Sequence, residues 1–218
     1  MAKRQKPEGM GRDERCAQIA ATLPDDPAEL LRAAFSAVES IDRSVLAGEL
    51  DAADAARNTY EAIVWKLNGG TMFASLDGPE APGNVVAAHC AAAPGIAPGW
   101  AQDGEFLVTA AGVRARVVVS HGFKSFGRHF AFHAVDRDRP FISQTGFRSH
   151  FQSPVVGRTV EQMAAAVLES LVAEQGGRVA IDRASRDRIE VPAWVQTIAP
   201  DDGPAVYADK KGQLCFGF

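Results

Sequence analysis

The residues with the most chemical potential in this chain are concentrated in one stretch, 128–151, with the sequence RHFAFHAVDRDRPFISQTGFRSHF. These 24 residues include three of the five histidines, four arginines and five phenylalanines. Guanidinium and imidazole groups donate hydrogen bonds to phosphate or carboxylate, and aromatic rings stack on nucleic-acid bases. Binding of an anionic ligand is therefore the first chemistry that the stretch suggests.

Spacing argues against catalysis and against a metal site in this stretch. His129 and His133 are four residues apart, so on a strand they share a face but lie about 13 Å from each other, at about 3.3 Å per residue. One ion cannot bridge that distance. The adjacent pairs Ser120-His121 and Ser149-His150 would point to opposite faces of a strand, so neither makes a nucleophile and base. No catalytic residue and no metal ligand is predicted.

Charge is unevenly distributed along the chain. Residues 106–150 hold seven Lys/Arg and two Asp, a net charge of +5 in a chain of −4, which leaves −9 for the remainder. A basic face on an acidic body is typical of binding to a polyanion or an acidic protein. Solvated strand faces are the alternative. The predicted phosphate, nucleic-acid or partner contacts are Arg114, Arg116, Lys124, Arg128, His129, His133 and Arg148.

Strand alternation makes that prediction more specific. Val113, Ala115, Val117 and Val119 fall on one face of a strand, and Arg114 and Arg116 fall on the other. We therefore expect Arg114, Arg116 and Arg148 to form one exposed basic patch. Arginine suits such a patch because its planar fork makes paired hydrogen bonds to phosphate or carboxylate.

Composition indicates an ordinary globular protein. The chain has 218 residues, of which 46% are hydrophobic and 23% charged. Three well-separated cysteines give no zinc spacing or disulfide framework, in keeping with a reducing cytoplasm. The polar N-terminus has no signal-peptide core, and no run approaches the ~18 apolar residues that span a bilayer. We expect a cytoplasmic protein without membrane insertion.

The N-terminal part of the sequence predicts helices. Residues 1–12 form a basic tail that we expect to be disordered, and 13–23 a short helix. Asp26-Pro27-Ala28-Glu29 is typical of a helix start, and Gly48 of its end. A second helix runs to Asn68-Gly69-Gly70, and the short joint indicates an antiparallel pair. The predicted domains are a tail at 1–12, a helical region at 13–70 and an α+β domain at 71–218.

The second half alternates in the manner of strands. Residues 71–76 predict a strand or an extended segment, and Asn84 the cap of a short helix. Strands are expected at 106–109, 113–119, 128–135, 141–145 and 178–181, with a terminal hairpin turning at 210–212. Thr159 and Gln162 predict a capping box for a helix at 159–174. The class is α+β: an N-terminal helical hairpin followed by a largely antiparallel sheet with one long packed helix.

The run at 128–151, together with YEAIVWKLNGGTMFASLDG at 60–78, resembles accessory proteins of broad-host-range conjugative plasmids, in particular the fertility-inhibition type. The resemblance covers about residues 60–151. It implies a protein that inhibits conjugative DNA transfer or protects the plasmid in its host. Some fertility inhibitors have a fold similar to ParB and sulfiredoxin, with nucleotide-dependent nuclease activity, and this is the alternative function. The implied partners are DNA, a nucleotide or a conjugation (type IV secretion) component. ATP and a divalent metal would be cofactors only of the nuclease.

Overall fold

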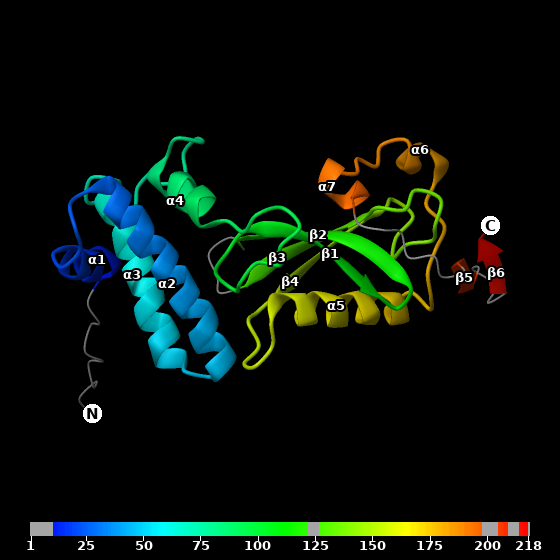
Figure 1. Cartoon of the computed structure of the whole chain (residues 1–218), viewed down its shortest axis with the longest axis horizontal. Coiled ribbons are helices and arrows are strands. Elements are labelled where there is room, and N and C mark those ends of the chain that lie inside the picture. Colours follow the sequence, from blue (N-terminus) through cyan, green and yellow to red (C-terminus); the bar gives the residue numbers. More distant parts are fainter. Residues whose placement is uncertain (1–10, 122–126, 198–204, 209–213, 218) are drawn as a thin grey trace, which may run out of the picture. The chain divides into compact units, whose positions relative to one another are not determined.

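The computed structural model describes residues 11–121, 127–197, 205–208 and 214–217. They fall into two units (Figure 1). Unit 1 is the described part of Met1–Ser44 with Glu49–Cys90, and unit 2 is Val45–Gly48 with the described part of Ala91–Phe218. The division follows Cys90 rather than residue 70, and most of the predicted tail lies outside the described residues. Across the described ranges, no helix has the length and apolar character needed to cross a membrane.

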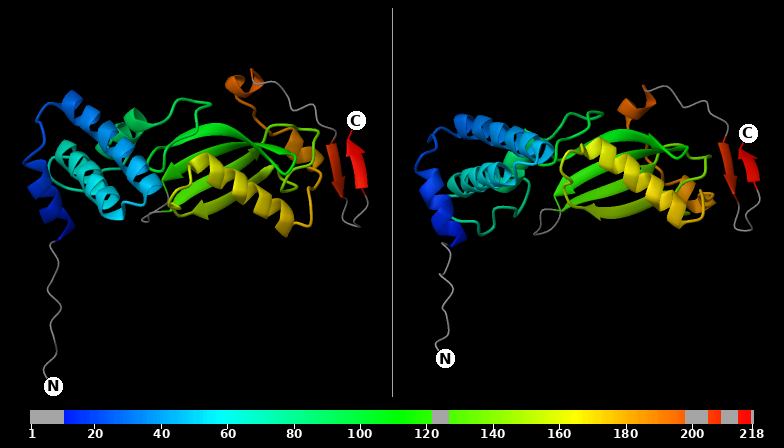
Figure 2. Two further views of the ribbon diagram at one scale, coloured as in Figure 1. Left: turned by 60° about the horizontal axis from the view of Figure 1, so that its bottom comes forward. Right: turned by 90° about the horizontal axis from the view of Figure 1, so that it is seen from below.

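Unit 1 is helical, as the sequence predicts. Asp26 caps the long second helix, because its Oδ1 accepts a hydrogen bond from the Glu29 backbone N–H at 2.9 Å. Gly48 ends that helix with φ +80°, a conformation that favours glycine. Figures 1 and 2 show α2 (Pro27–Ala47) and α3 (Leu50–Leu67) running side by side. The helices are α1 (Arg12–Ala20), α2 (Pro27–Ala47), α3 (Leu50–Leu67) and α4 (Pro82–Cys90).

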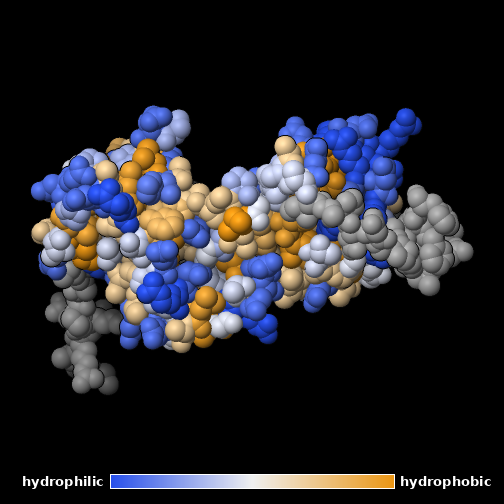
Figure 3. Space-filling view, in the orientation of Figure 1, coloured by the Kyte–Doolittle hydropathy of each residue, from blue (hydrophilic) through white to orange (hydrophobic). Residues whose placement is uncertain are grey.

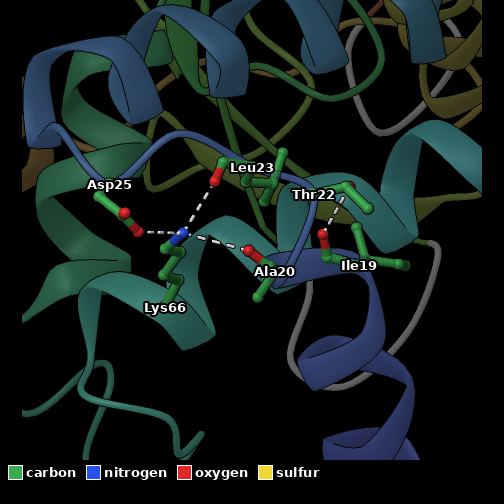
Figure 4. A network of polar contacts seen from close by, with 6 residues as sticks. All are labelled: Ile19, Ala20, Thr22, Leu23, Asp25 and Lys66. Carbon is green, nitrogen blue, oxygen red and sulfur yellow. Dashed lines mark hydrogen bonds and ion pairs between the residues drawn. The ribbon is translucent and has the colours of Figure 1, made fainter.

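One lysine ties α1 to α3 (Figure 4). Nζ of Lys66, on α3, donates to the carbonyl oxygen of Ala20, the last residue of α1, at 3.1 Å and to that of Leu23 at 2.9 Å. It also pairs with Asp25 at 2.7 Å. The hydrogen bond from Lys66, followed by its charge, lowers the pKa of Asp25. The ammonium group thus neutralises the end of one helix from the side of another.

Two local predictions in unit 1 are wrong. Residues 73–76 form a turn, with Ala74 at φ +58°, rather than the strand or extended segment predicted at 71–76. Asn84 lies within α4 and does not cap it. Its side-chain amide instead donates to the carbonyls of Leu76 and Gly78 at 3.2 and 2.7 Å, holding the preceding loop against the helix. Asparagine serves either role, and the sequence pattern does not distinguish them.

Unit 2 contains a four-stranded antiparallel sheet in which each strand pairs with its neighbour in the chain. The first hairpin turns at Ala111 and Gly112, with φ +49° and +67°. Two positive φ values make the primed turn whose twist matches the strands. The strands are β1 (Gly104–Ala110), β2 (Val113–His121), β3 (Arg128–Ala134) and β4 (Phe147–Gln152).

The core of unit 2 lies between one face of this sheet and α5 (Val160–Glu174). Phe106, Val117 and Phe132 stand opposite one another across three strands and are fully buried. Figure 2 shows α5 running across the sheet, and α5 contacts β1. Thr159 and Gln162 form the predicted capping box, because each side chain bonds the other residue's backbone N–H at 3.1 Å. The predicted α+β class with one long packed helix is confirmed.

Other strand predictions in unit 2 are wrong. Residues 141–145 and 178–181 form no strands and meet only in a single bridge between Phe141 and Val179. The fourth strand begins later, after a turn in which Gly146 has φ +71°. The predicted terminal hairpin pairs as expected, although its turn at 210–212 lies outside the described residues. The remaining elements are α6 (Arg183–Arg186), α7 (Ala193–Gln196), β5 (Ala205–Ala208) and β6 (Leu214–Gly217).

Candidate nucleic-acid interface

The sheet register separates the predicted binding residues onto two faces. Cross-strand partners share a face, and adjacent residues point to opposite faces. Arg116 lies opposite His133, on the face away from the phenylalanine core. Arg148 lies opposite Phe132, so it shares the core face at the border of the sheet. The expectation that Arg114, Arg116 and Arg148 form one patch is therefore wrong.

The expected exposure of the two β2 arginines is also wrong. Arg114 is only 9% exposed, and its guanidinium lies 3.6 Å from the Asp136 carboxylate. Arg116 pairs with Glu105 at 2.9 Å. Glu105 also accepts a hydrogen bond from Trp194 Nε1 at 2.8 Å, which places α7 beside this pair. Both arginines have carboxylate partners within the fold, and their charge is largely neutralised there.

Arg128 has a structural environment. Its side chain is 4% exposed, its Nη2 pairs with Asp103 Oδ1 at 2.8 Å, and it also donates to the Gln102 carbonyl oxygen. A buried guanidinium needs such partners, because its desolvation costs several kcal/mol. Arg128 therefore holds the segment before β1 against the start of β3.

The two histidines of β3 stand beside exposed phenylalanines of β4. The His129 ring centroid lies 4.9 Å from that of Phe151, and the His133 centroid 5.1 Å from that of Phe147. Burial, and secondarily the charge of Arg116, lowers the pKa of His133 below its ordinary value. His133 is thus mainly neutral at neutral pH, when it can donate to a ligand but supplies no full charge.

Arg148 differs from the other predicted arginines, because it is exposed and forms no ion pair with the residues that the structure describes. Lys124 lies outside the described residues. Ligand contact by all seven predicted residues stays a prediction. Within the described ranges, no group of three or more His, Cys, Asp or Glu residues is arranged to hold a metal ion.

Unit 1 carries a second polar surface, on the outer face of α2. Four side chains at helical spacing, Arg32, Ser36, Glu39 and Arg43, are exposed, and Phe35 beside them is 37% exposed. We call these five residues the α2 face. The opposite side of the helix buries Leu30, Ala34, Val38 and Ile41. The i, i+4, i+7, i+11 spacing of the polar residues was visible in the sequence, but the charge count drew attention only to the β-rich half.

The arginines of the α2 face are available to a ligand. Arg32 lies 3.7 Å from Glu29, with both side chains more than half exposed, and such pairs contribute little. Arg43 forms no ion pair with a described residue. Unit 1 as a whole is acidic, since residues 11–90 contain six Lys/Arg and thirteen Asp/Glu. On the side drawn in Figure 3, hydrophobic residues are scattered among hydrophilic ones.

Two family models match the chain in separate segments. Residues 15–89 match the KlcB N-terminal DNA-binding domain, and residues 103–194 match the KlcB third domain. These segments correspond to the helices of unit 1 and to the sheet, α5 and the short helices of unit 2.

Two relatives from Escherichia coli, both named Protein KlcB, are similar to nearly the whole chain. One is 45% identical over 207 residues, which is 92% of this chain and 52% of the relative. The other is 42% identical over 203 residues, which is 91% of this chain and 44% of the relative. The chain thus spans about half the length of the curated relatives it matches. No solved structure matches it significantly.

Proposed function

We propose that this chain is a DNA-binding accessory factor of plasmid type and that unit 1 contacts the DNA. The observation that carries the proposal is the match of residues 15–89 to the KlcB N-terminal DNA-binding domain. Those residues contain α2 with its exposed polar face, whereas most of the sheet arginines have carboxylate partners inside the fold.

The α2 face has the composition of a helix that enters the major groove. The groove of B-DNA, about 12 Å wide, admits an α-helix. Arg32 and Arg43 lie about 16 Å apart along the helix, at about 1.5 Å per residue, so their guanidiniums reach the phosphates on either side of the groove. Between them, Ser36 and Glu39 offer hydrogen bonds to base edges. Glutamate accepts from cytosine N4, and Phe35 suits the thymine methyl group.

The acidity of unit 1 predicts an unusual salt dependence for this binding. Each neutralised phosphate contributes about −0.9 to the slope of log K against log salt. With two arginines as the phosphate contacts, the expected slope is about −2, shallow for a DNA-binding protein. Most of the affinity would then come from base contacts, so the proposal requires sequence preference rather than general attraction to DNA.

The first prediction tests the α2 face. In the full chain, the double substitution Arg32→Glu with Arg43→Glu is expected to weaken binding of double-stranded DNA at least about tenfold, because each contact is lost and replaced by repulsion. Fluorescence anisotropy with a labelled duplex at several salt concentrations measures both the affinity and the slope. Exposed positions tolerate substitution, so the melting temperature should change little.

Arg148→Glu is the matched control, since Arg148 is also exposed but lies in unit 2. It is expected to leave DNA affinity within about twofold of the parent. If Arg148→Glu abolishes binding and the α2 double variant does not, DNA is bound at the sheet rather than at unit 1. Electrophoresis of the DNA after incubation with ATP and Mg²⁺ tests the nuclease alternative, because a binding protein leaves the duplex intact.

We further propose that DNA binding by this chain inhibits conjugative transfer, as its resemblance to fertility-inhibition proteins implies. Donor cells that express the chain beside a second conjugative plasmid are expected to transfer that plasmid at least about tenfold less often. The α2 double variant should restore transfer, and Arg148→Glu should not. If all three proteins leave the mating frequency unchanged while the parent binds DNA, the chain acts on DNA but not in fertility inhibition.

A further inference from the structure

The strand β4 is a border of the sheet with an unusual composition. It pairs with β3 on one side, and no described residue pairs with it on the other (Figure 2). It also carries two large exposed apolar side chains, Phe147 at 43% and Phe151 at 68% exposure. An exposed, apolar edge strand invites pairing with another strand, and proteins usually cover or charge such edges. The edge of β4 therefore points to a partner.

The sheet register shows which backbone groups of β4 point outward. The Ala134 N–H donates to the Gly146 carbonyl oxygen at 2.8 Å, so residues 148, 150 and 152 direct their N–H and C=O groups toward β3. Residues 147, 149 and 151 consequently direct theirs outward. Among the described residues, only Phe147 finds partners there, since its N–H donates to Ser143 Oγ at 3.1 Å and its oxygen accepts from Ser143 Oγ at 2.8 Å.

Ser149 and Phe151 are thus left as an open pair of hydrogen-bonding positions on the edge. We propose that they pair with the same two residues of a second copy of this chain, so that β4 and its counterpart run antiparallel about a two-fold axis and join the two sheets into one. Ser149 lies opposite the partner's Phe151, and Phe151 opposite the partner's Ser149. Each such pair exchanges both backbone hydrogen bonds. The contact is isologous, the commonest kind in oligomers.

Charge placement in this register favours a second copy. The two-fold axis sets His150, rather than an arginine, opposite its own copy. Arg148 lies opposite the partner's Gln152, whose amide oxygen accepts a hydrogen bond. No two arginines are opposed. A shift of the axis to Ser149 would set Arg148 opposite the partner's His150 and would require the Phe147 groups that Ser143 already occupies.

The buried area predicts how strong the contact is. The exposed parts of Phe147 and Phe151 together equal about one whole phenylalanine side chain, or about 200 Å², on each copy. Even with the edge backbones included, the area that the two copies bury together is below about 1,200 Å², where stable interfaces begin. We therefore expect a weak, concentration-dependent dimer that forms without DNA.

The test exploits the two-fold axis at position 150. Sedimentation velocity of the full chain at increasing concentration should show a reversible monomer–dimer equilibrium. His150→Lys and His150→Asp are each expected to weaken dimerisation about tenfold or more, since each sets two like charges face to face. An equimolar mixture of the two variants should restore the dimer, because lysine then faces aspartate. If β4 instead bound a different partner with a charged residue at the facing position, one of the two substitutions would weaken that binding and the other would strengthen it.

A second pair of variants examines the hydrogen bonds themselves. Ser149→Pro removes the outward N–H, whereas Ser149→Ala keeps it, so only the proline variant should fail to dimerise. Phe151→Ser, at an exposed position, should weaken the dimer without lowering the melting temperature. A parent chain that stays monomeric at all concentrations overturns the proposal. So does a dimer that tolerates both charges at position 150.

Discussion

Replacing Leu168 with alanine is expected to lower the free energy of unfolding of unit 2 by about 2–5 kcal/mol, the range for buried leucines. Leu168 is 0% exposed on the stripe of α5 that also buries Val160, Ala164 and Leu171. Its removal leaves a cavity between the helix and the sheet, because the surrounding strands can collapse only in part. Urea denaturation monitored by hydrogen exchange of the sheet amides measures the change in unit 2 by itself.

The next residue provides the control for this experiment. Glu169 lies on the same turn of α5 but is exposed. Glu169→Ala should therefore change the free energy of unfolding by no more than about 0.5 kcal/mol. A loss below that value for Leu168→Ala as well would mean that α5 does not cover the core face of the sheet.

The variant Arg128→Met is expected to cost about 2–4 kcal/mol of stability. Methionine keeps much of the side-chain volume but removes the cation that pairs with Asp103 and donates to the Gln102 carbonyl. Breaking a buried pair by removing one partner costs about 3–5 kcal/mol, and we reduce this value because Asp103 is 32% exposed and partly solvated. Thermal or urea unfolding of the full chain measures the loss.

Arg148→Met provides the comparison for Arg128, since its side chain is exposed and should tolerate the change within about 0.5 kcal/mol. The pair also separates structure from binding. If Arg128→Met unfolds like the parent and yet loses affinity for DNA, Arg128 is a ligand contact, as the sequence alone suggested. If it loses stability and the remaining folded protein binds DNA normally, its role is structural.

The features that the sequence predicted well depend on residues close together in the chain. The Thr159–Gln162 capping box, the Asp26 cap and the turn at Gly112 each involve a few neighbouring residues whose side chains or φ angles determine the local geometry. The alternation of valines along β2 likewise predicted its buried face. Such features need no knowledge of the rest of the fold.

The prediction of the basic patch failed because its arginines have partners that lie outside the local pattern. The segment with a net charge of +5 began at residue 106, just after Asp103 and Glu105, the acids that pair with Arg128 and Arg116. Arg148 fell on the opposite face from Arg116 because the register sets it opposite Phe132, whereas Arg116 lies opposite His133. Charge counts along a sequence therefore predicted the composition of the sheet but not its free surface.

The order of the strands also has a consequence for synthesis. Because β1 to β4 pair in chain order, the sheet can assemble from local contacts as each hairpin leaves the ribosome. Its last residue, Gln152, leaves the ribosome before any of α5 does, so the phenylalanine face is briefly without its cover. At about 5–20 residues per second, the helix follows within about 1–5 s. During that interval the nascent chain presents an apolar, aggregation-prone surface that the folded protein buries.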